Sequence, residues 1–210
     1  MRIEIVIYEG FDEMDAIAPY EVLRSAATSE SANFEVVLVN AAGAGLVTAA
    51  NGLQLLVSEE LGHPDALIVP GGGWGDRAGR GAWAEVQRGA LPRRIAEVAS
   101  NCQWVASVCT GAMLLAAAEL TNGRPAITHH AAIDDLAASG AHVIEGARVV
   151  DDGDLLTGAG ITSGLDLALW IVEREAGGAL ASRVARLIEH ERSSAIWTRE
   201  KPLLASQMRV

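Results

Sequence analysis

The residue pattern with the most specific chemical meaning is centred on Cys109. The apolar run Trp104–Val108 reads as a strand that ends at this cysteine, and Gly111 opens a helix-favouring run directly after it. Strand, tight turn and helix in this order are typical of a nucleophile elbow, which holds a reactive side chain at the carboxyl edge of a sheet. A helix N-terminus also favours a thiolate. The sequence therefore predicts a nucleophilic Cys109, with the role of a small buried apolar residue as the alternative.

The second cysteine and the histidine pair carry weaker signals. Cys102 lies in a polar junction, and its spacing from Cys109 fits neither a redox C-x-x-C motif nor a zinc site. The pair His129-His130 follows Thr128 and the short apolar run Pro125–Ile127. A histidine is the usual general base for a thiol, but a His pair is equally consistent with a solvated helix start. Without a third ligand we predict no metal site.

A glycine loop follows a second buried run, Ala66–Val69. Gly71 and Gly72 are consecutive glycines, which expose backbone N–H groups and allow close approach of a ligand. In a parallel sheet this loop opens on the same edge as Cys109. Together with the amide of Thr110, it is predicted to form an oxyanion-type pocket.

Asp15 is the acidic residue best placed to meet Cys109 across the sheet edge. It begins the first helical run, Asp15–Ser29, directly after the first strand. An N-terminal capping role explains its position equally well. A later run, Gly158–Gly164, looks like a G-x-G-x-x-G phosphate loop, but no acidic strand end follows it. We interpret that run as a tight connection that lines the pocket.

Strands and helices alternate along the chain, which predicts an α/β fold. The strand candidates are Ile3–Tyr8, Phe34–Val39, Ala66–Val69 and Trp104–Val108. The helix candidates are Asp15–Ser29, Trp83–Ala99 with a break at Pro92, Gly111–Glu119 and Ser163–Glu175. Almost fully apolar strands are typical of a parallel sheet that is buried on both faces. The prediction is a doubly wound, mostly parallel sheet sandwiched by helices.

Two hairpins are predicted to interrupt this alternation. One is Leu46–Val57, with its turn at Asn51-Gly52, and the other is Val143–Thr157, with its turn at Asp151–Gly153. A last amphipathic helix is expected over 179–192. We therefore predict one domain over residues 1–192 and a C-terminal tail over 193–210, which is docked, involved in a dimer contact or disordered.

Composition limits the possible partners. The chain has 27 acidic and 16 basic residues and a net charge of −11, which disfavours binding to nucleic acid or to an anionic membrane. Half of the residues are apolar, but no run approaches the roughly 18 residues of a membrane span. The first residues read as a strand rather than a signal peptide. The expected location is cytoplasmic, with reduced thiols.

Taken in order, these motifs resemble the ThiJ/PfpI superfamily, relatives of the class I glutamine amidotransferases. The resemblance extends to about Glu175 and rests on Met14-Asp15, Pro70–Gly72, Ser107–Gly111, Thr128-His129 and Leu156–Gly164. It implies a flavodoxin-like sheet, a homodimer and an acidic residue that is hydrogen-bonded to the elbow cysteine.

Details of the motifs indicate a branch of the superfamily. Its intracellular proteases carry His directly after the cysteine, where this chain has Thr110, and its chaperone and deglycase-like branch carries Glu where this chain has Asp15. Asp15, the Cys-Thr-Gly elbow and the late Gly-Ile-Thr-x-Gly run look like the isocyanide hydratases. His130 departs from their pattern, which typically has Trp there. Sensor domains of AraC-type regulators share these features, but the stretch after Glu175 is too short for their helix-turn-helix domain.

The resemblance implies a lyase that adds water to small isocyanides and releases N-substituted formamides, without a cofactor. Cys109 would attack the terminal carbon, and Asp15, with a pKa raised by burial, would supply a proton and later activate water. The amides of Gly72 and Thr110 would stabilise developing charge.

Two further residues complete the expected site. His129 would lie behind the cysteine and orient it, and Ile161 would mark an apolar pocket for a neutral substrate. The alternatives are a glyoxalase- or deglycase-like enzyme acting on 2-oxoaldehydes and a non-enzymatic redox or stress sensor that uses Cys109.

Overall fold

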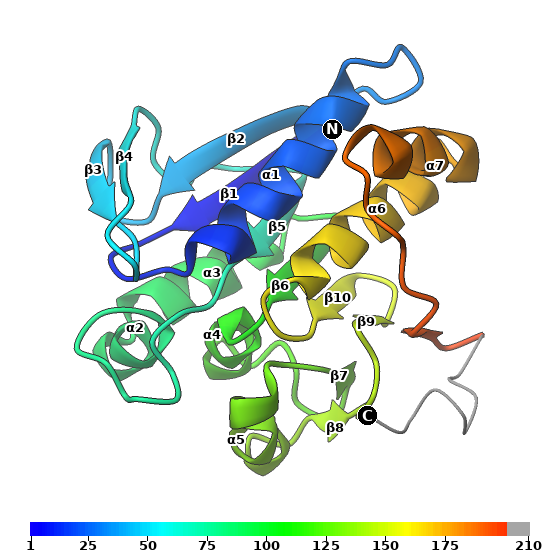
Figure 1. Cartoon of the computed structure of the whole chain (residues 1–210). Coiled ribbons are helices and arrows are strands. Elements are labelled where there is room, and N and C mark those ends of the chain that lie inside the picture. Colours follow the sequence, from blue (N-terminus) through cyan, green and yellow to red (C-terminus); the bar gives the residue numbers. More distant parts are fainter. Residues whose placement is uncertain (201–210) are drawn as a thin grey trace.

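Five neighbouring strands run parallel in a seven-stranded sheet in the computed structural model, which describes residues 1–200 (Figure 1). The strands of this sheet lie in the order β11-β9-β10-β6-β5-β1-β2, and β9 and β11 run antiparallel to the other five. Their bounds are β1 Arg2–Ile7, β2 Glu35–Asn40, β5 Ala66–Val69, β6 Trp104–Val108, β9 Val149–Asp151, β10 Leu155–Gly158 and β11 Ile196–Thr198. The predicted doubly wound, flavodoxin-like α/β fold is confirmed.

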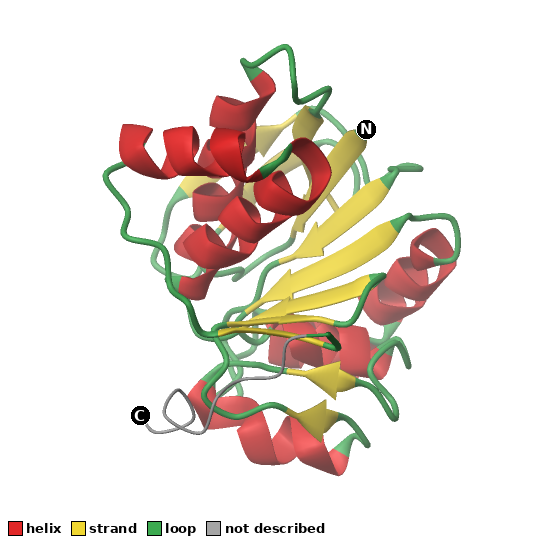
Figure 2. Ribbon diagram, turned by 90° about the vertical axis from the view of Figure 1, so that its right-hand side faces the viewer, coloured by secondary structure: helices red, strands yellow, loops and turns green. Residues whose placement is uncertain are grey.

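Helices cover both faces of the sheet (Figure 2). One layer contains α1 (Glu13–Ala27), α6 (Ser163–Ala176) and α7 (Gly178–Leu187), which pack against one another. The other layer contains α2 (Ala82–Arg88), α3 (Ala90–Ala99) and α4 (Gly111–Ala117). Every residue of β5 and β6 is buried, so an exposed face would leave apolar side chains in water, and helices on both sides remove that penalty.

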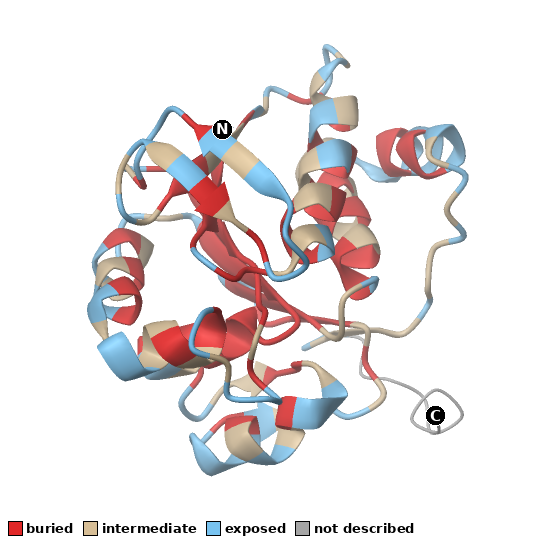
Figure 3. Cartoon of the chain, turned by 60° about the vertical axis from the view of Figure 1, so that its left-hand side comes forward, coloured by how far each residue is buried: buried red, intermediate tan, exposed pale blue. Residues whose placement is uncertain are grey.

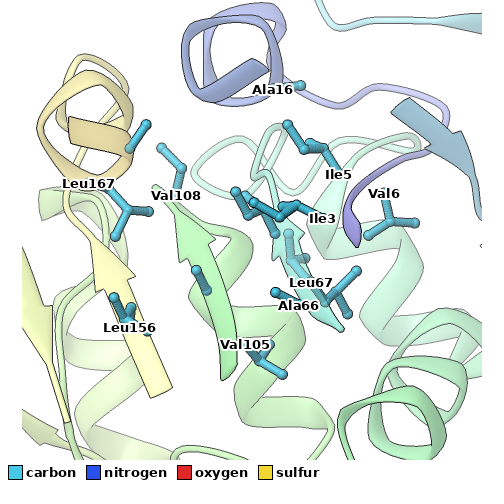
Figure 4. Close-up of a cluster of buried hydrophobic side chains, with 14 of the residues drawn as sticks. Ile3, Ile5, Val6, Ala16, Ala66, Leu67, Val105, Val108, Leu156 and Leu167 are labelled. Carbon is cyan, nitrogen blue, oxygen red and sulfur yellow. The ribbon is translucent and has the colours of Figure 1, made fainter. Parts of the chain in front are cut away.

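The core lies between the sheet and these layers, as Figure 3 shows by the buried central strands and the exposed outer helix surfaces. In Figure 4, Ile3 and Ile5 of β1 and Leu67 of β5 lie below Ala16 of α1. Val108, the last residue of β6, packs beside Leu167 of α6. The residue before the elbow cysteine is therefore held by the main core.

Smaller elements form two further sheets outside this one. The hairpin β3 (Gly45–Thr48) and β4 (Gln54–Val57) forms a separate antiparallel pair, as predicted. A second small sheet pairs β7 (Pro125–Ala126) with β8 (His142–Val143), beside the 3₁₀ turn His130–Ala132 and the helix α5 (Ile133–Ala138). The predicted hairpin over 143–157 is shorter than expected, because Val143 pairs with β7 while β9 and β10 alone form the hairpin.

Two helix predictions were wrong in detail. The helix predicted over 83–99 breaks at Gly89, not at Pro92, because Gly89 adopts a left-handed φ of 72° and ends α2. Pro92 lies in the first turn of α3, where its missing N–H has no intrahelical partner to lose. The last helix ends at Leu187, five residues before the predicted end.

The chain after α7 crosses back to the sheet. Ile196–Thr198 pairs in parallel with β9 and forms the edge strand β11. This part of the predicted tail is docked, and residues 201–210 lie outside the described residues. No helix within residues 1–200 combines the length and the hydropathy that crossing a bilayer requires.

Candidate active site

The turn between β6 and α4 places Cys109 at the carboxyl edge of the sheet. Cys109 has a φ of 56°, a left-handed conformation that costs energy in a residue with a side chain, and the thiol side chain is 5% exposed. Its N–H lies 3.1 Å from the carbonyl oxygen of Gly158 and 2.9 Å from that of Ala159, which hold the strained turn. A Cβ at Gly111 would lie 2.1 Å from the carbonyl oxygen of Val69, so only glycine fits two residues after the cysteine. The geometry is that of the predicted elbow.

Asp15 meets the cysteine from the first helix. Its carboxyl group is fully buried, interacts with the Cys109 thiol, and accepts the N–H of Gly71 at 3.0 Å through Oδ2. The N-cap of α1 is Asp12, whose side chain accepts the N–H of Met14, so Asp15 is free of the capping role that its position allowed. Within the described residues, Oδ1 of Asp15 has no hydrogen-bond partner. An unpartnered buried carboxyl oxygen is best accommodated as a neutral acid.

Burial sets the protonation of this pair. Burial, followed by the charge of Asp12, raises the pKa of Asp15 to about 8. Burial, followed by the charge of Asp15, raises the pKa of the Cys109 thiol to about 12. The N–H groups of Ile161 and Thr110 face the sulfur and lower its pKa, but they do not outweigh burial. The effect of the helix N-terminus on this thiol stays a prediction, and burial acts against it.

The glycine loop positions the site but does not offer free oxyanion donors. The N–H of Gly71 is used by Asp15, and the N–H of Gly72 donates to Oγ1 of Thr110 at 2.9 Å. The predicted pocket of Gly71, Gly72 and Thr110 amides is corrected accordingly, because the amides that face the sulfur belong to Thr110 and Ile161. The glycine loop does pack closely on the turn that carries Thr110, because a Cβ on Gly71 would lie 2.4 Å from Oγ1 of Thr110.

The histidine motif lies behind the elbow, with Thr128 nearest to it. Oγ1 of Thr128 donates to the carbonyl oxygen of Cys109 at 2.9 Å. His129 is half-buried, and its ring lies against Gly160, where an added Cβ would be 2.7 Å from Cδ2. Its Nδ1 accepts the N–H of Ala131 at 3.2 Å, and burial, with the nearby charge of His130, lowers its pKa. His129 therefore supports the loop that carries Ile161, and the direct contact with the cysteine comes from Thr128.

Sequence reasoning missed Tyr8, which follows β1 directly. Its hydroxyl donates to the carbonyl oxygen of Pro70 at 2.6 Å, and burial, with the charges of Asp15 and Cys109, raises its pKa well above the ordinary value. Tyr8 also lines a cavity of about 650 Å³ together with Leu46 and Arg88. The available signal was its place at the carboxyl end of the first strand, next to the loops that carry the site.

Metal ligands do not converge in the described part of the chain. Within residues 1–200, no group of three or more His, Cys, Asp or Glu side chains is arranged to hold a metal ion. The chemistry available from the residues around the elbow is that of a thiol and a carboxylic acid in a dry environment.

Known proteins resemble this chain in sequence and in fold. The sequence model of the DJ-1/PfpI family matches residues 1–174. The chain is 34% identical over 195 residues to an isonitrile hydratase from Pseudomonas putida, covering 90% of this chain and 78% of that protein. A solved ThiJ/PfpI family protein from Pseudomonas syringae superposes with a TM-score of 0.79 at 26% identity, over 91% of this chain and 76% of that one. Drosophila melanogaster DJ-1beta shares the fold at 21% identity, with a TM-score of 0.76 over 90% of this chain and 98% of that one. By its sequence and its fold, this chain belongs to the DJ-1/PfpI family.

Proposed function

We propose that this chain is a cysteine-dependent isocyanide hydratase, a lyase that converts R–N≡C and water into an N-substituted formamide. The observation that carries the proposal is the buried Asp15 carboxyl, which interacts with the Cys109 thiol and has an unpartnered Oδ1. Such an acid can deliver a proton beside the attacking sulfur. The 34% identity to an isonitrile hydratase supports the same substrate class.

The first step joins the thiol to the isocyanide carbon. The sulfur of Cys109 forms a C–S bond, and a proton from the Asp15–Cys109 pair goes to the same carbon, giving the thioimidate R–N=CH–S–Cys. The pKa values of both groups are raised because burial disfavours charge. A neutral acid and thiol that react with a neutral substrate avoid placing a free anion in this site.

The second step releases the product. Asp15, which has regained a proton from the thiol, donates it to the nitrogen while its other oxygen takes a proton from water, and the water oxygen adds to the thioimidate carbon. The C–S bond then breaks, the hydroxyl proton returns to the sulfur through Asp15, and the formamide leaves as the thiol is restored. The amides of Ile161 and Thr110 face the sulfur and would stabilise negative charge on it as the C–S bond breaks. No step uses a cofactor, and we place the reaction in the cytoplasm.

The test is formamide production from a simple alkyl isocyanide, followed for wild type, Cys109→Ala and Asp15→Asn. The expected result is turnover by wild type that falls at least 1000-fold in Cys109→Ala and at least 100-fold in Asp15→Asn. Cys102→Ser is the matched control, because the Cys102 thiol is half-buried and donates to the backbone oxygens of Val98 and Pro64, away from the elbow. This variant is expected to keep the wild-type rate.

Two results would overturn the proposal or part of it. Turnover that survives Cys109→Ala removes the nucleophile assignment. If wild type produces no formamide, the hydratase proposal fails, and the same variants are then assayed with 2-oxoaldehydes and with peroxide. Turnover of methylglyoxal would favour a glyoxalase-like enzyme, and selective oxidation of Cys109 without turnover would favour a redox sensor.

A further inference from the structure

The loop that carries Ile161 is connected to the C-terminal segment through Arg148, a residue outside the catalytic motifs. The backbone N–H of Arg148 donates to the carbonyl oxygen of Ala195 at 2.8 Å. Its carbonyl oxygen accepts the N–H of Ala159 at 2.9 Å, and the carbonyl oxygen of Ala159 accepts the N–H of Cys109 at 2.9 Å. A continuous series of backbone hydrogen bonds therefore runs from the segment before β11 to the elbow cysteine.

The side chain of Arg148 also contacts this loop, in addition to the backbone hydrogen bonds. Its Nε donates to Oδ2 of Asp166 at 2.6 Å, while its Nη2 donates to Oγ1 of Thr162 at 3.1 Å. A planar guanidinium can span two acceptors in fixed directions, and a flexible ammonium cannot. Thr162 is the next residue after Ile161, whose N–H faces the sulfur of Cys109. The guanidinium thus ties the end of the loop to a buried carboxylate on α6.

Asp166 is itself fixed by the chain that follows α7. The side chain is 3% exposed, and Oδ1 accepts the N–H of Ser193 at 2.9 Å and lies 3.0 Å from Nε2 of His190. Burial alone would raise the pKa of Asp166, but the hydrogen bonds from Ser193, His190 and Arg148 outweigh burial and lower the pKa. The anchor of Arg148 is therefore a charged, fully engaged carboxylate.

We propose that Arg148 is a positioning residue, which holds the loop over residues 159–162 against the Cys109 elbow and so sets the reactivity of this thiol. The effect reaches Cys109 through Thr162 and the backbone of Ala159, and Arg148 itself touches neither the thiol nor a substrate. The predicted effect on thiol reactivity holds whatever the substrate is. A predicted effect on turnover rests on the proposed hydratase function. Any loss of the amide interaction destabilises the thiolate relative to the thiol.

The experiment measures the rate constant for alkylation of Cys109 by iodoacetamide between pH 7 and pH 10, with the modified peptide quantified by mass spectrometry. The variants are Arg148→Met and Thr162→Val. Loss of one amide hydrogen bond to a thiolate is expected to raise the thiol pKa by roughly 0.5 to 1, which slows alkylation about 3- to 10-fold at each pH. Asp15, Asp12 and Tyr8, the other groups that face this thiol electrostatically, are unchanged in both variants.

Arg174→Met is the matched control. Arg174 also joins α6 to the β9–β10 hairpin, through Asp151 at 3.4 Å and the carbonyl oxygen of Gly153 at 2.7 Å, but these contacts do not involve the loop beside Cys109. Its loss is expected to lower Tm without changing the alkylation rate. If Arg148→Met does not fold, the alkylation rate of Thr162→Val alone tests the proposal. Thr162 is exposed, and its replacement leaves the Arg148–Asp166 pair in place.

Alkylation of Thr162→Val and of folded Arg148→Met at the wild-type rate, or faster, overturns the proposal. The alkylation assay needs no isocyanide. It therefore tests the role of Arg148 even if the chain is not a hydratase. If the chain is a hydratase, Arg148→Met is also expected to lower kcat with little change in KM, because the loop acts on the nucleophile.

Discussion

Burial away from water sets the protonation states of both Asp15 and Cys109. The carboxyl group is fully covered by surrounding residues, and its pKa rises to about 8, while that of the thiol rises to about 12. Neither shift comes from a basic partner, so at neutral pH the pair is mostly uncharged. This is a site suited to moving a proton together with bond formation.

The raised pKa of Asp15 predicts how stability changes with pH. Between the ordinary value of 3.8 and about 8, the folded chain keeps a proton that the unfolded chain releases, so stability falls as the pH rises through this range. Asp15→Asn removes this penalty. Its free energy of unfolding, measured by urea denaturation, is expected to exceed that of wild type at pH 8 by on the order of 2 kcal/mol, with the difference lost near pH 4.

The control for this prediction is Glu21→Gln, which alters an exposed carboxyl on the same helix. It is expected to change stability little at either pH. A wild type that is as stable as Asp15→Asn at pH 8 would contradict a neutral buried carboxyl.

At the scale of elements, the site depends on the close approach of two loops that follow neighbouring parallel strands. The loop after β5 packs on the turn after β6, and Gly71 lies where a Cβ would be 2.4 Å from Oγ1 and 2.5 Å from N of Thr110. Two of these loop amides also hold Asp15 and Thr110 in place. The glycines here serve packing as much as hydrogen bonding.

Gly71→Ala is therefore expected to displace the elbow. We expect a loss of about 1–3 kcal/mol in the free energy of unfolding from overpacking, together with a loss of Cys109-dependent activity. Gly79→Ala is the matched variant further along the connection from β5 to α2, where an added Cβ meets nothing within 4 Å. Its urea midpoint is expected to stay at that of wild type, and equal midpoints for both variants would show that the loops do not pack as described.

At the scale of the whole molecule, the apolar surface is unevenly distributed. In the described part of the chain, the large apolar side chains that are exposed are Met14, Leu46, Leu53, Leu56 and Leu187. The first four lie on the β3–β4 hairpin and the start of α1, which are joined by hydrogen bonds from the backbone N–H groups of the hairpin turn to Glu13. Apolar side chains gathered on one face are typical of an interaction surface.

The homodimer implied by the family resemblance remains a prediction, and we place its interface on this hairpin face. Sedimentation velocity is expected to give the mass of two chains for wild type and of one chain for Leu56→Asp, since Leu56 is 83% exposed. Leu187→Asp, which alters a 70% exposed leucine on α7, is expected to remain dimeric. A monomeric wild type would contradict the dimer, and a dimeric Leu56→Asp would contradict the placement.

Much of the fold was predictable because it depends on local patterns. The apolar runs that form β1, β2, β5 and β6 were predicted within a residue or two. In β1, β5 and β6, burial on both faces leaves a nearly continuous apolar run. Gly89 was missed as the helix break because a proline three residues later is the stronger local signal. Pro92 is harmless there only because a new helix begins at Ala90.

What the sequence by itself determined is the central strands β1, β2, β5 and β6 and the approach of Asp15, Gly71 and Cys109, because the carboxyl ends of neighbouring parallel strands meet at one edge. Only the tertiary structure decided the charge of the pair, the amides that reach the sulfur, and the connection from Ser193 through Arg148 to the elbow. The physical reason is that desolvation and hydrogen-bond partners depend on segments up to about a hundred residues apart, packed together in space. Local periodicity carries no information about either of them.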